Sequence, residues 1–257
     1  MPSTQVLLET NKLGIDFGGL TAVNNFNIKI HHDEIYGLIG PNGAGKTTIF
    51  NLLTKVYMPT RGKIWLNNKD ITKLNTVQVS KRGIARTFQN IRLFSNLTVI
   101  DNVLIAMNND THYHLFDALL RTKKFYKLEK EKYDEAIKLL KIFNLDSFKD
   151  VKASSLPYGA QRRLEIARAL ATHPCLLLLD EPAAGMNPSE TMELLDTVKR
   201  IKEEFNISIL LIEHDMKFVM GVCDNITVLY FGQVLASGTP EEIKNNPEVI
   251  KAYLGGA

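Results

Sequence analysis

The segment Gly40–Thr47 constrains the fold of this chain more than any other part of it. It reads Gly-Pro-Asn-Gly-Ala-Gly-Lys-Thr and matches the pattern Gly-x-x-x-x-Gly-Lys-Ser/Thr. An apolar run precedes it at 35–39, and apolar residues at helical spacing follow it from 47 to 54. A loop of this kind between a buried strand and a helix turns its N–H groups toward phosphate, and the helix dipole assists binding. The segment therefore predicts an α/β fold with a phosphate site at a strand end.

The residues of this loop have separate expected roles. Lys46 can neutralise β- and γ-phosphate oxygens, and the Thr47 hydroxyl can hold Mg²⁺. A glycine-rich turn with an exposed lysine is the alternative, but it explains neither the full spacing nor the apolar run. The expected phosphate-binding set is Gly40, Pro41, Asn42, Gly43, Ala44, Gly45, Lys46, Thr47 and Thr48.

Two acids, Asp180 and Glu181, directly follow four leucines at 176–179. Open α/β sheets bind ligands at the carboxyl ends of such strands. One carboxylate, Asp180, suffices to hold Mg²⁺, which leaves Glu181 to orient and polarise a water in line with the γ-phosphate. Simple capping of a strand at the surface is the alternative, and the phosphate loop makes it the weaker one.

Composition limits the class of protein further. With 257 residues, 45% hydrophobic and 23% charged, the chain can form one large α/β domain and is not of the disordered or disulfide-scaffold class. A net charge of +3 is too small to argue for nucleic acid. Cys175 and Cys223 are expected to be reduced core thiols of a cytosolic protein. The start of the chain has no secretion-signal pattern and no run is long enough to span a membrane, so any membrane role is expected to be peripheral.

The pattern of apolar residues divides the chain into β-rich parts and a helical part. From 98 to 145 the period is helical, which predicts an inserted helical lobe. Basic residues between Arg121 and Lys132 alternate with acids and predict a solvated helix face, with contact to anionic lipid or a membrane subunit as the alternative. Strands are expected at 6–8, 25–30, 35–39, 63–66, 176–179, 207–212 and 226–230, the last three in a largely parallel sheet.

A second motif, at residues 156–170, indicates a particular family of phosphate-binding proteins. Residues 156–170 read Leu-Pro-Tyr-Gly-Ala-Gln-Arg-Arg-Leu-Glu-Ile-Ala-Arg-Ala-Leu and lie shortly before Asp180-Glu181-Pro182. The pair resembles the signature and Walker B segments of ABC-type ATPases, and the chain is identified as a member of that family. The resemblance implies an α/β P-loop NTPase (RecA-like) core with an N-terminal antiparallel β subdomain and an inserted α-helical subdomain. A single domain, 1–257, is expected, with the core at 1–90 and 160–257 and the helical subdomain at about 91–159.

The resemblance also assigns roles to single residues. His214 has the place of the switch histidine that contacts the γ-phosphate, Gln89 that of the Q-loop glutamine, and Phe17 that of the aromatic residue stacked on adenine. A core phenylalanine is the alternative for Phe17. With ATP and Mg²⁺ as ligands, the implied catalytic residues are Lys46, Gln89, Glu181 and His214, and the implied metal ligands are Thr47, Gln89 and Asp180.

The signature departs from the family pattern Leu-Ser-Gly-Gly-Gln at its phosphate-facing positions. Pro157 stands where the serine is common and Ala160 where the glutamine is. Proline offers neither a hydroxyl nor an N–H. The resemblance implies that Gly159 and the following helix N-terminus bind the ATP of a partner subunit, in weakened form. We expect a slow half-site, unless the Gly159 amide alone is sufficient.

Three further segments, 86–94, 180–188 and 245–255, look like those of the ATP-binding subunits of branched-chain amino-acid importers. That resemblance implies a second ATP-binding subunit in a head-to-tail homo- or heterodimer, two transmembrane permeases that contact residues 89–102, and indirectly a substrate-binding protein. No nucleic-acid partner is expected, and the resemblance implies a peripheral location at the cytoplasmic face of the inner (plasma) membrane. The alternatives are an ATPase of another ABC assembly, such as a lipid or lipopolysaccharide exporter, and an ATP-binding regulatory subunit with weak hydrolysis.

Overall fold

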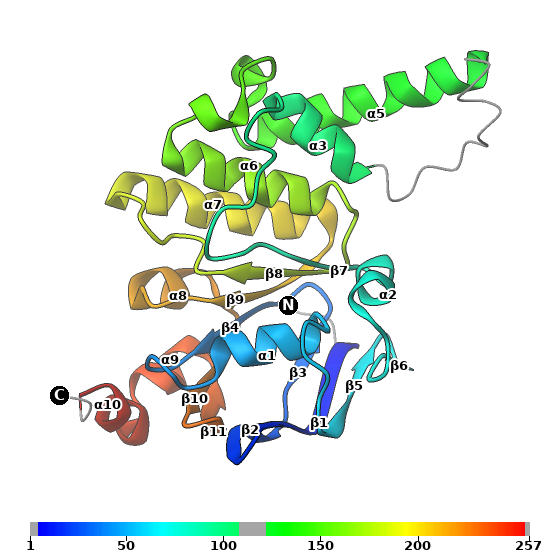
Figure 1. The fold of residues 1–257 in the computed structure, drawn as a ribbon. Helices are drawn as coiled ribbons and strands as arrows, with labels where there is room; N and C mark the ends of the chain where they lie inside the picture. Colours follow the sequence, from blue (N-terminus) through cyan, green and yellow to red (C-terminus); the bar gives the residue numbers. More distant parts are fainter. Residues whose placement is uncertain (1–4, 108–121, 255–257) are drawn as a thin grey trace. The chain divides into compact units, whose positions relative to one another are not determined.

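The computed structural model describes residues 5–107 and 122–254 (Figure 1). Contacts divide the chain into two compact units: the described residues up to Gln89 together with those from Cys175 onward form the first unit, and Asn90–Pro174 forms the second. The first unit holds both sheets and the phosphate loop. The second unit is helical. The expected α/β fold, with an N-terminal antiparallel sheet beside a parallel one and an inserted helical part, is confirmed.

The main sheet of the first unit is mostly parallel. Its order is β11-β10-β4-β9-β8-β7, and only the β10–β11 pair is antiparallel. The strands β4, β8 and β9 are buried at every position, as their continuous apolar runs predict. The bounds are β4 Ile35–Ile39, β7 Ile84–Arg86, β8 Leu176–Asp180, β9 Ser208–Ile212, β10 Asn225–Tyr230 and β11 Gln233–Gly238.

The second sheet of this unit is antiparallel and built around one long strand. β1 (Val6–Phe17) pairs with β2 (Leu20–Phe26), β3 (Lys29–His31) and β5 (Arg61–Leu66), and β5 pairs with β6 (Lys69–Asp70). The sequence indicated only 6–8 as the first strand. Lys12, with a positive φ of 48°, and register shifts in β1 interrupt the alternation of apolar residues and hide the rest.

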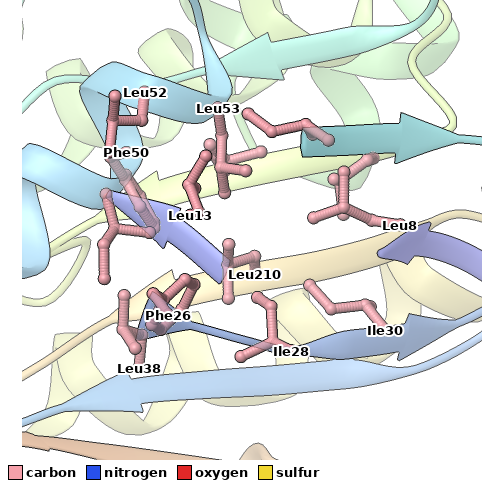
Figure 2. Close-up of a cluster of buried hydrophobic side chains, with 14 of the residues drawn as sticks. Leu8, Leu13, Phe26, Ile28, Ile30, Leu38, Phe50, Leu52, Leu53 and Leu210 are labelled. Atoms are coloured by element: carbon pink, nitrogen blue, oxygen red, sulfur yellow. The ribbon is translucent and has the colours of Figure 1, made fainter. Parts of the chain in front are cut away.

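One hydrophobic core joins the two sheets of the first unit. Figure 2 shows side chains of β1, β2 and β3 against those of β4, β9 and helix α1 (Lys46–Leu53). Phe26, Phe50 and Leu210 are fully buried in it. This core holds the start of α1, and with it the phosphate loop, in place. The other helices of the unit are α2 Thr76–Lys81, α7 Pro188–Phe205, α8 Met216–Val222, α9 Pro240–Lys244 and α10 Pro247–Leu254.

The helical unit contains α3 (Val99–Met107), α5 (Lys123–Ile142) and α6 (Tyr158–Leu170), with short 3-10 turns at Asp146–Phe148 and Ala153–Ser155. In α5 the predicted amphipathic pattern is present: Ala136, Leu139 and Leu140 are buried and most of the lysines are exposed. Arg121 of the basic run lies outside the described residues. Across the described ranges no helix is both long and apolar enough to cross a membrane.

The boundary of the helical unit differs from the expected one near residue 159. Helix α6 belongs to this unit because it packs on α3 and α5. Inside the unit, the fully buried Arg162 pairs with Glu165 at 2.8 Å, and the Glu165 carboxylate also accepts the N–H of Arg92. An amphipathic helix next to a Walker B strand does not reveal from sequence alone which neighbour it packs against.

Candidate functional site

A cavity of about 500 Å³ in the first unit collects the phosphate loop and the polar residues that follow neighbouring strands. Its polar lining includes Gln89, Glu181 and His214 together with Lys46. Residues of β2 and of the turn after β10 also line it. The lining residues are Leu20, Thr21, Ala22, Asn42, Gly43, Ala44, Gly45, Lys46, Thr47, Thr48, Gln89, Glu181, His214, Phe231 and Gly232.

The phosphate loop connects β4 to α1 as the sequence predicts. Gly40 opens it with φ 151°, and a Cβ there would lie 2.2 Å from the Leu229 carbonyl oxygen, so only glycine fits. Helix α1 begins at Lys46 with no acid in its first turn, which leaves its N–H groups and its positive dipole end to an anion. The loop can therefore hold phosphate groups by main-chain donors.

The side chain of Lys46 folds back over this loop. Its Nζ donates to the Gly40 carbonyl at 2.7 Å and to the Pro41 carbonyl at 3.0 Å. Burial lowers the pKa of Lys46, and the nearby carboxylates of Glu181 and Asp180 partly oppose that shift. A further anion near this ammonium group, such as a phosphate, would stabilise its charged form more.

The side chain of Glu181, which follows β8, contacts residues that follow β7 and β9. Its Oε1 lies 2.7 Å from Nε2 of His214, and its Oε2 accepts a hydrogen bond from Nε2 of Gln89 at 2.8 Å. The backbone of Glu181 is left-handed, with φ 48°, and its N–H donates to the Ile212 carbonyl. The structure thus brings together Gln89, Glu181 and His214, which follow β7, β8 and β9.

Two of the implied metal ligands are hard oxygen donors. Thr47 is exposed at the start of α1, and Asp180 is buried at the end of β8. The described part of the chain has no cluster of three or more His, Cys, Asp or Glu side chains that could hold a metal by themselves. Mg²⁺ is normally bound by one or two protein oxygens, substrate phosphates and waters, so this donor set fits Mg²⁺ beside a nucleotide.

Phe17 lies beside the cavity but is not one of its lining residues. It ends β1, pairs with Leu20 of β2, and meets Tyr57 edge-on with ring centroids 5.2 Å apart. The residue is 43% exposed, so it is not a core side chain. The exposed part of its side chain is available to a ligand.

The signature residues lie in the helical unit. Pro157 is the N-cap of α6 and makes no side-chain cap hydrogen bond. Gly159 is the second residue of the helix, where N–H groups have no intrahelical acceptor. Gln161 donates its side-chain amide to the Leu156 carbonyl at 2.8 Å. The helix start thus has the main-chain donors that the sequence analysis expects and lacks the hydroxyl.

Sequence reasoning missed two kinds of residue at the site. The buried Glu213 accepts the N–H groups of Ala183 at 2.7 Å and His214 at 3.0 Å, and burial raises its pKa. An acid directly after a buried strand was the available signal. Phe231, 77% exposed, lines the cavity from the turn between β10 and β11, and no local pattern distinguishes it from any other turn residue.

Comparison with known proteins shows which family this chain belongs to. Residues 23–184 match the ABC transporter family, and residues 233–257 match the family described as branched-chain amino acid ATP-binding cassette transporter. The high-affinity branched-chain amino acid transport ATP-binding protein LivG of Escherichia coli K12 is 50% identical over 254 residues, which is 99% of this chain and 100% of LivG. BraF of Pseudomonas aeruginosa, with the same description, is 47% identical over 98% of both chains.

Solved structures show the same fold. The ADP conformation of an ATP-binding cassette of an ABC transporter superposes with a TM-score of 0.85 at 31% identity, covering 98% of this chain and 100% of the other. A nucleotide-free cassette gives a TM-score of 0.84 at 32% identity, covering 97% and 99%. Phosphate loop, strand-end carboxylates, family match and fold agree, and the chain belongs to the ABC transporter family of ATPases.

Proposed function

We propose that this chain is the ATP-hydrolysing subunit of an importer of branched-chain amino acids. The observation that carries the proposal is the 50% identity to LivG over nearly the whole of both chains. The separate match of residues 233–257 to a branched-chain amino acid transporter family supports the same assignment. The core motifs alone would fit any ABC assembly.

ATP binding is assigned to the cavity on the phosphate loop. The N–H groups of the loop and of the first turn of α1, including Thr48, would surround the phosphates. Lys46 would exchange the carbonyls of Gly40 and Pro41 for β- and γ-phosphate oxygens, since an anionic acceptor gives the stronger hydrogen bond. The half-exposed Phe17 would stack on adenine.

Hydrolysis is assigned to Glu181. Its carboxylate, held by His214 and Gln89, would orient and polarise a water for attack on the γ-phosphate. His214 lines the same cavity and would contact the γ-phosphate. Mg²⁺, when bound, supplies positive charge to the phosphate oxygens. Thr47, Asp180 and Gln89 would hold it.

The subunit is proposed to act as one half of a head-to-tail pair, with an identical or a similar partner. The first-turn N–H groups of α6 at Gly159 would face the ATP of the partner subunit. Two membrane permeases would receive the movement at residues 89–102, and a substrate-binding protein would deliver the amino acid. This arrangement places the chain at the cytoplasmic face of the inner membrane as a peripheral subunit.

The proposal is tested by measuring ATP hydrolysis and amino-acid uptake in the same preparation. The chain is purified with its permease pair and partner ATPase, reconstituted in proteoliposomes with ATP at the ATPase side, and uptake of labelled leucine is measured with its binding protein outside. Wild type should take up leucine, and Glu181→Gln should bind ATP without turnover or uptake. ATP hydrolysis without uptake of any branched-chain amino acid would overturn the substrate assignment, and absence of hydrolysis would overturn the proposal.

A further inference from the structure

The side chain of Arg86, at the end of β7, is buried in the first unit and lies over two aromatic rings. Its side chain is 7% exposed. Its guanidinium carbon lies 5.4 Å from the ring centroid of Phe50 and 5.1 Å from that of Phe88. Such stacking fixes the plane of the guanidinium group and therefore the directions of its N–H donors.

The two ends of this guanidinium bind different elements. One terminal nitrogen donates to Oδ2 of Asp180 at 2.7 Å. The other donates to Oδ1 of Asn51 at 2.6 Å and reaches the hydroxyl of Thr54 at 3.5 Å. Asn51 belongs to α1 and Asp180 ends β8. Arg86 therefore bridges the helix that begins with Lys46 and Thr47 to the strand that ends in the carboxylate.

We infer that Arg86 is a positioning residue for the divalent-cation site of the nucleotide cavity. It would hold the carboxylate of Asp180 at a fixed place relative to α1, which carries the Thr47 hydroxyl. The inference rests on the proposed function, because it presumes a cation beside a bound nucleotide. Neither composition nor motif spacing assigns this arginine a role, since its partners lie 35 and 94 residues away in the chain.

Arg86 has two opposing effects on the affinity of the site for a divalent cation, and we expect the positioning of Asp180 to be the larger. Its positive charge repels a second cation. Its hydrogen bond, however, holds a carboxylate that is almost fully buried in one orientation, and a ligand oxygen fixed in this way favours binding of a divalent cation. Groups that orient a metal ligand in this way typically contribute 10- to 100-fold in metal affinity or activity. The backbone N–H of Asp180 also donates to the Thr87 hydroxyl at 3.3 Å, so β7 and β8 are tied at the same point.

A lysine cannot take over this role completely. Its single ammonium group has no planar fork, so it cannot lie flat over the rings of Phe50 and Phe88 while binding acceptors on both α1 and β8. Arg86→Lys keeps the charge and removes the bridge, whereas Arg86→Met removes both. The pair of variants separates the effect of charge from the effect of position.

The experiment measures how strongly Mg²⁺ and nucleotide binding are coupled. The affinity of the full chain for a fluorescent ATP analogue is determined in EDTA and in Mg²⁺, for wild type, Arg86→Met, Arg86→Lys and Arg200→Met. Arg200 is the matched control, because its ion pair with Glu204 is exposed on α7. Thermal melting by circular dichroism shows that each variant is folded.

We expect wild type and Arg200→Met to bind the analogue more tightly in Mg²⁺ by the same factor. In Arg86→Met the ratio of the affinity in Mg²⁺ to the affinity in EDTA should fall about tenfold or more. Its affinity in EDTA should stay within about twofold of the wild-type value. Arg86→Lys should recover only a small part of that ratio, and it decides the question if Arg86→Met does not fold. An unchanged or larger Mg²⁺ effect in the Arg86 variants overturns the inference, with a larger one marking Arg86 as a competitor of the cation. Absence of any Mg²⁺ effect in wild type would instead contradict the proposed site itself.

Discussion

Nε2 of His214 lies 2.7 Å from Oε1 of Glu181, and this contact joins the residues that follow β8 and β9. The same carboxylate is held from the other side by Gln89. A carboxylate with two fixed partners has few orientations, which is what a group that must point at one water needs. The contact indicates that His214 helps to fix the position of Glu181.

Replacing Glu181 by Gln should lower ATP turnover at least about 100-fold, because an amide cannot accept the proton of the attacking water. ATP binding should persist, since the phosphate loop is untouched. Phosphate release and nucleotide affinity are measured in parallel. Glu203→Gln, at an exposed site on α7, is the control and should leave both unchanged. Turnover near the wild-type value in Glu181→Gln would show that another group activates the water.

Pro157→Ser should raise turnover in the assembled ATPase pair. A serine hydroxyl would restore one hydrogen bond to phosphate worth about 1.5–3 kcal/mol, equivalent to roughly ten- to a hundredfold in rate at the half-site it serves. Steady-state ATPase activity of the pair is the measurement, with Ser154→Ala in the neighbouring 3-10 turn as the control. No gain would mean that the N–H groups at Gly159 are sufficient.

Phe17→Ala should weaken ATP binding by about 1–3 kcal/mol, the usual contribution of a base stacked on an aromatic ring. Binding of inorganic tripolyphosphate should not change, because it has no base. Competition against a fluorescent nucleotide measures both. Phe231→Ala serves as the comparison, since Phe231 is an aromatic residue that lines the cavity from the turn between β10 and β11. A loss confined to Phe231→Ala would move the base to that turn.

Lys55 gives a prediction about stability and pH. Its Nζ is buried without a hydrogen-bond partner among the described residues, and burial lowers its pKa from 10.5 to about 8. At pH 7 the folded chain therefore carries a poorly solvated charge, which costs it stability. Between pH 8 and 10.5 the unfolded chain binds more protons than the folded one, so this cost disappears as the pH rises.

Lys55→Met should accordingly raise the free energy of unfolding by about 2 kcal/mol at pH 7 and by much less at pH 10. Urea unfolding at both values measures the difference. Lys217→Met, at an exposed position on α8, should show no such pH dependence. An equal effect of Lys55→Met at the two pH values would contradict a lowered pKa.

The parts of the fold that the sequence predicts are those where burial is uniform. Strands β4, β8 and β9 are covered on both faces, so their apolar runs are unbroken and their polar ends are easy to locate. The strand β1 has buried and exposed positions in no regular alternation and shifts register, so only a short stretch at its start was predicted. A strand can be predicted from its local sequence pattern when all of its residues have the same degree of burial.

The parts of the site that escaped prediction depend on contacts distant in sequence. Glu213 acts on the N–H of Ala183, and Arg86 acts on Asn51 and Asp180, in each case across at least 30 residues. Helix α6 was expected at the edge of the core but packs inside the helical unit. Residue type and spacing show which residues can bind phosphate. Only the folded chain shows which other residues keep those in position.

The turn at Gly232 has a consequence for the order of events during synthesis. Its N–H donates to the Ala44 carbonyl of the phosphate loop at 2.9 Å, and its carbonyl accepts the N–H of Asn24 at 2.8 Å. Chains are made from the N-terminus at about 5–20 residues per second, so the loop emerges from the ribosome roughly ten seconds or more before the turn that completes its surroundings. A nascent chain can form the motif early, but its nucleotide pocket is finished only when residue 232 has been released.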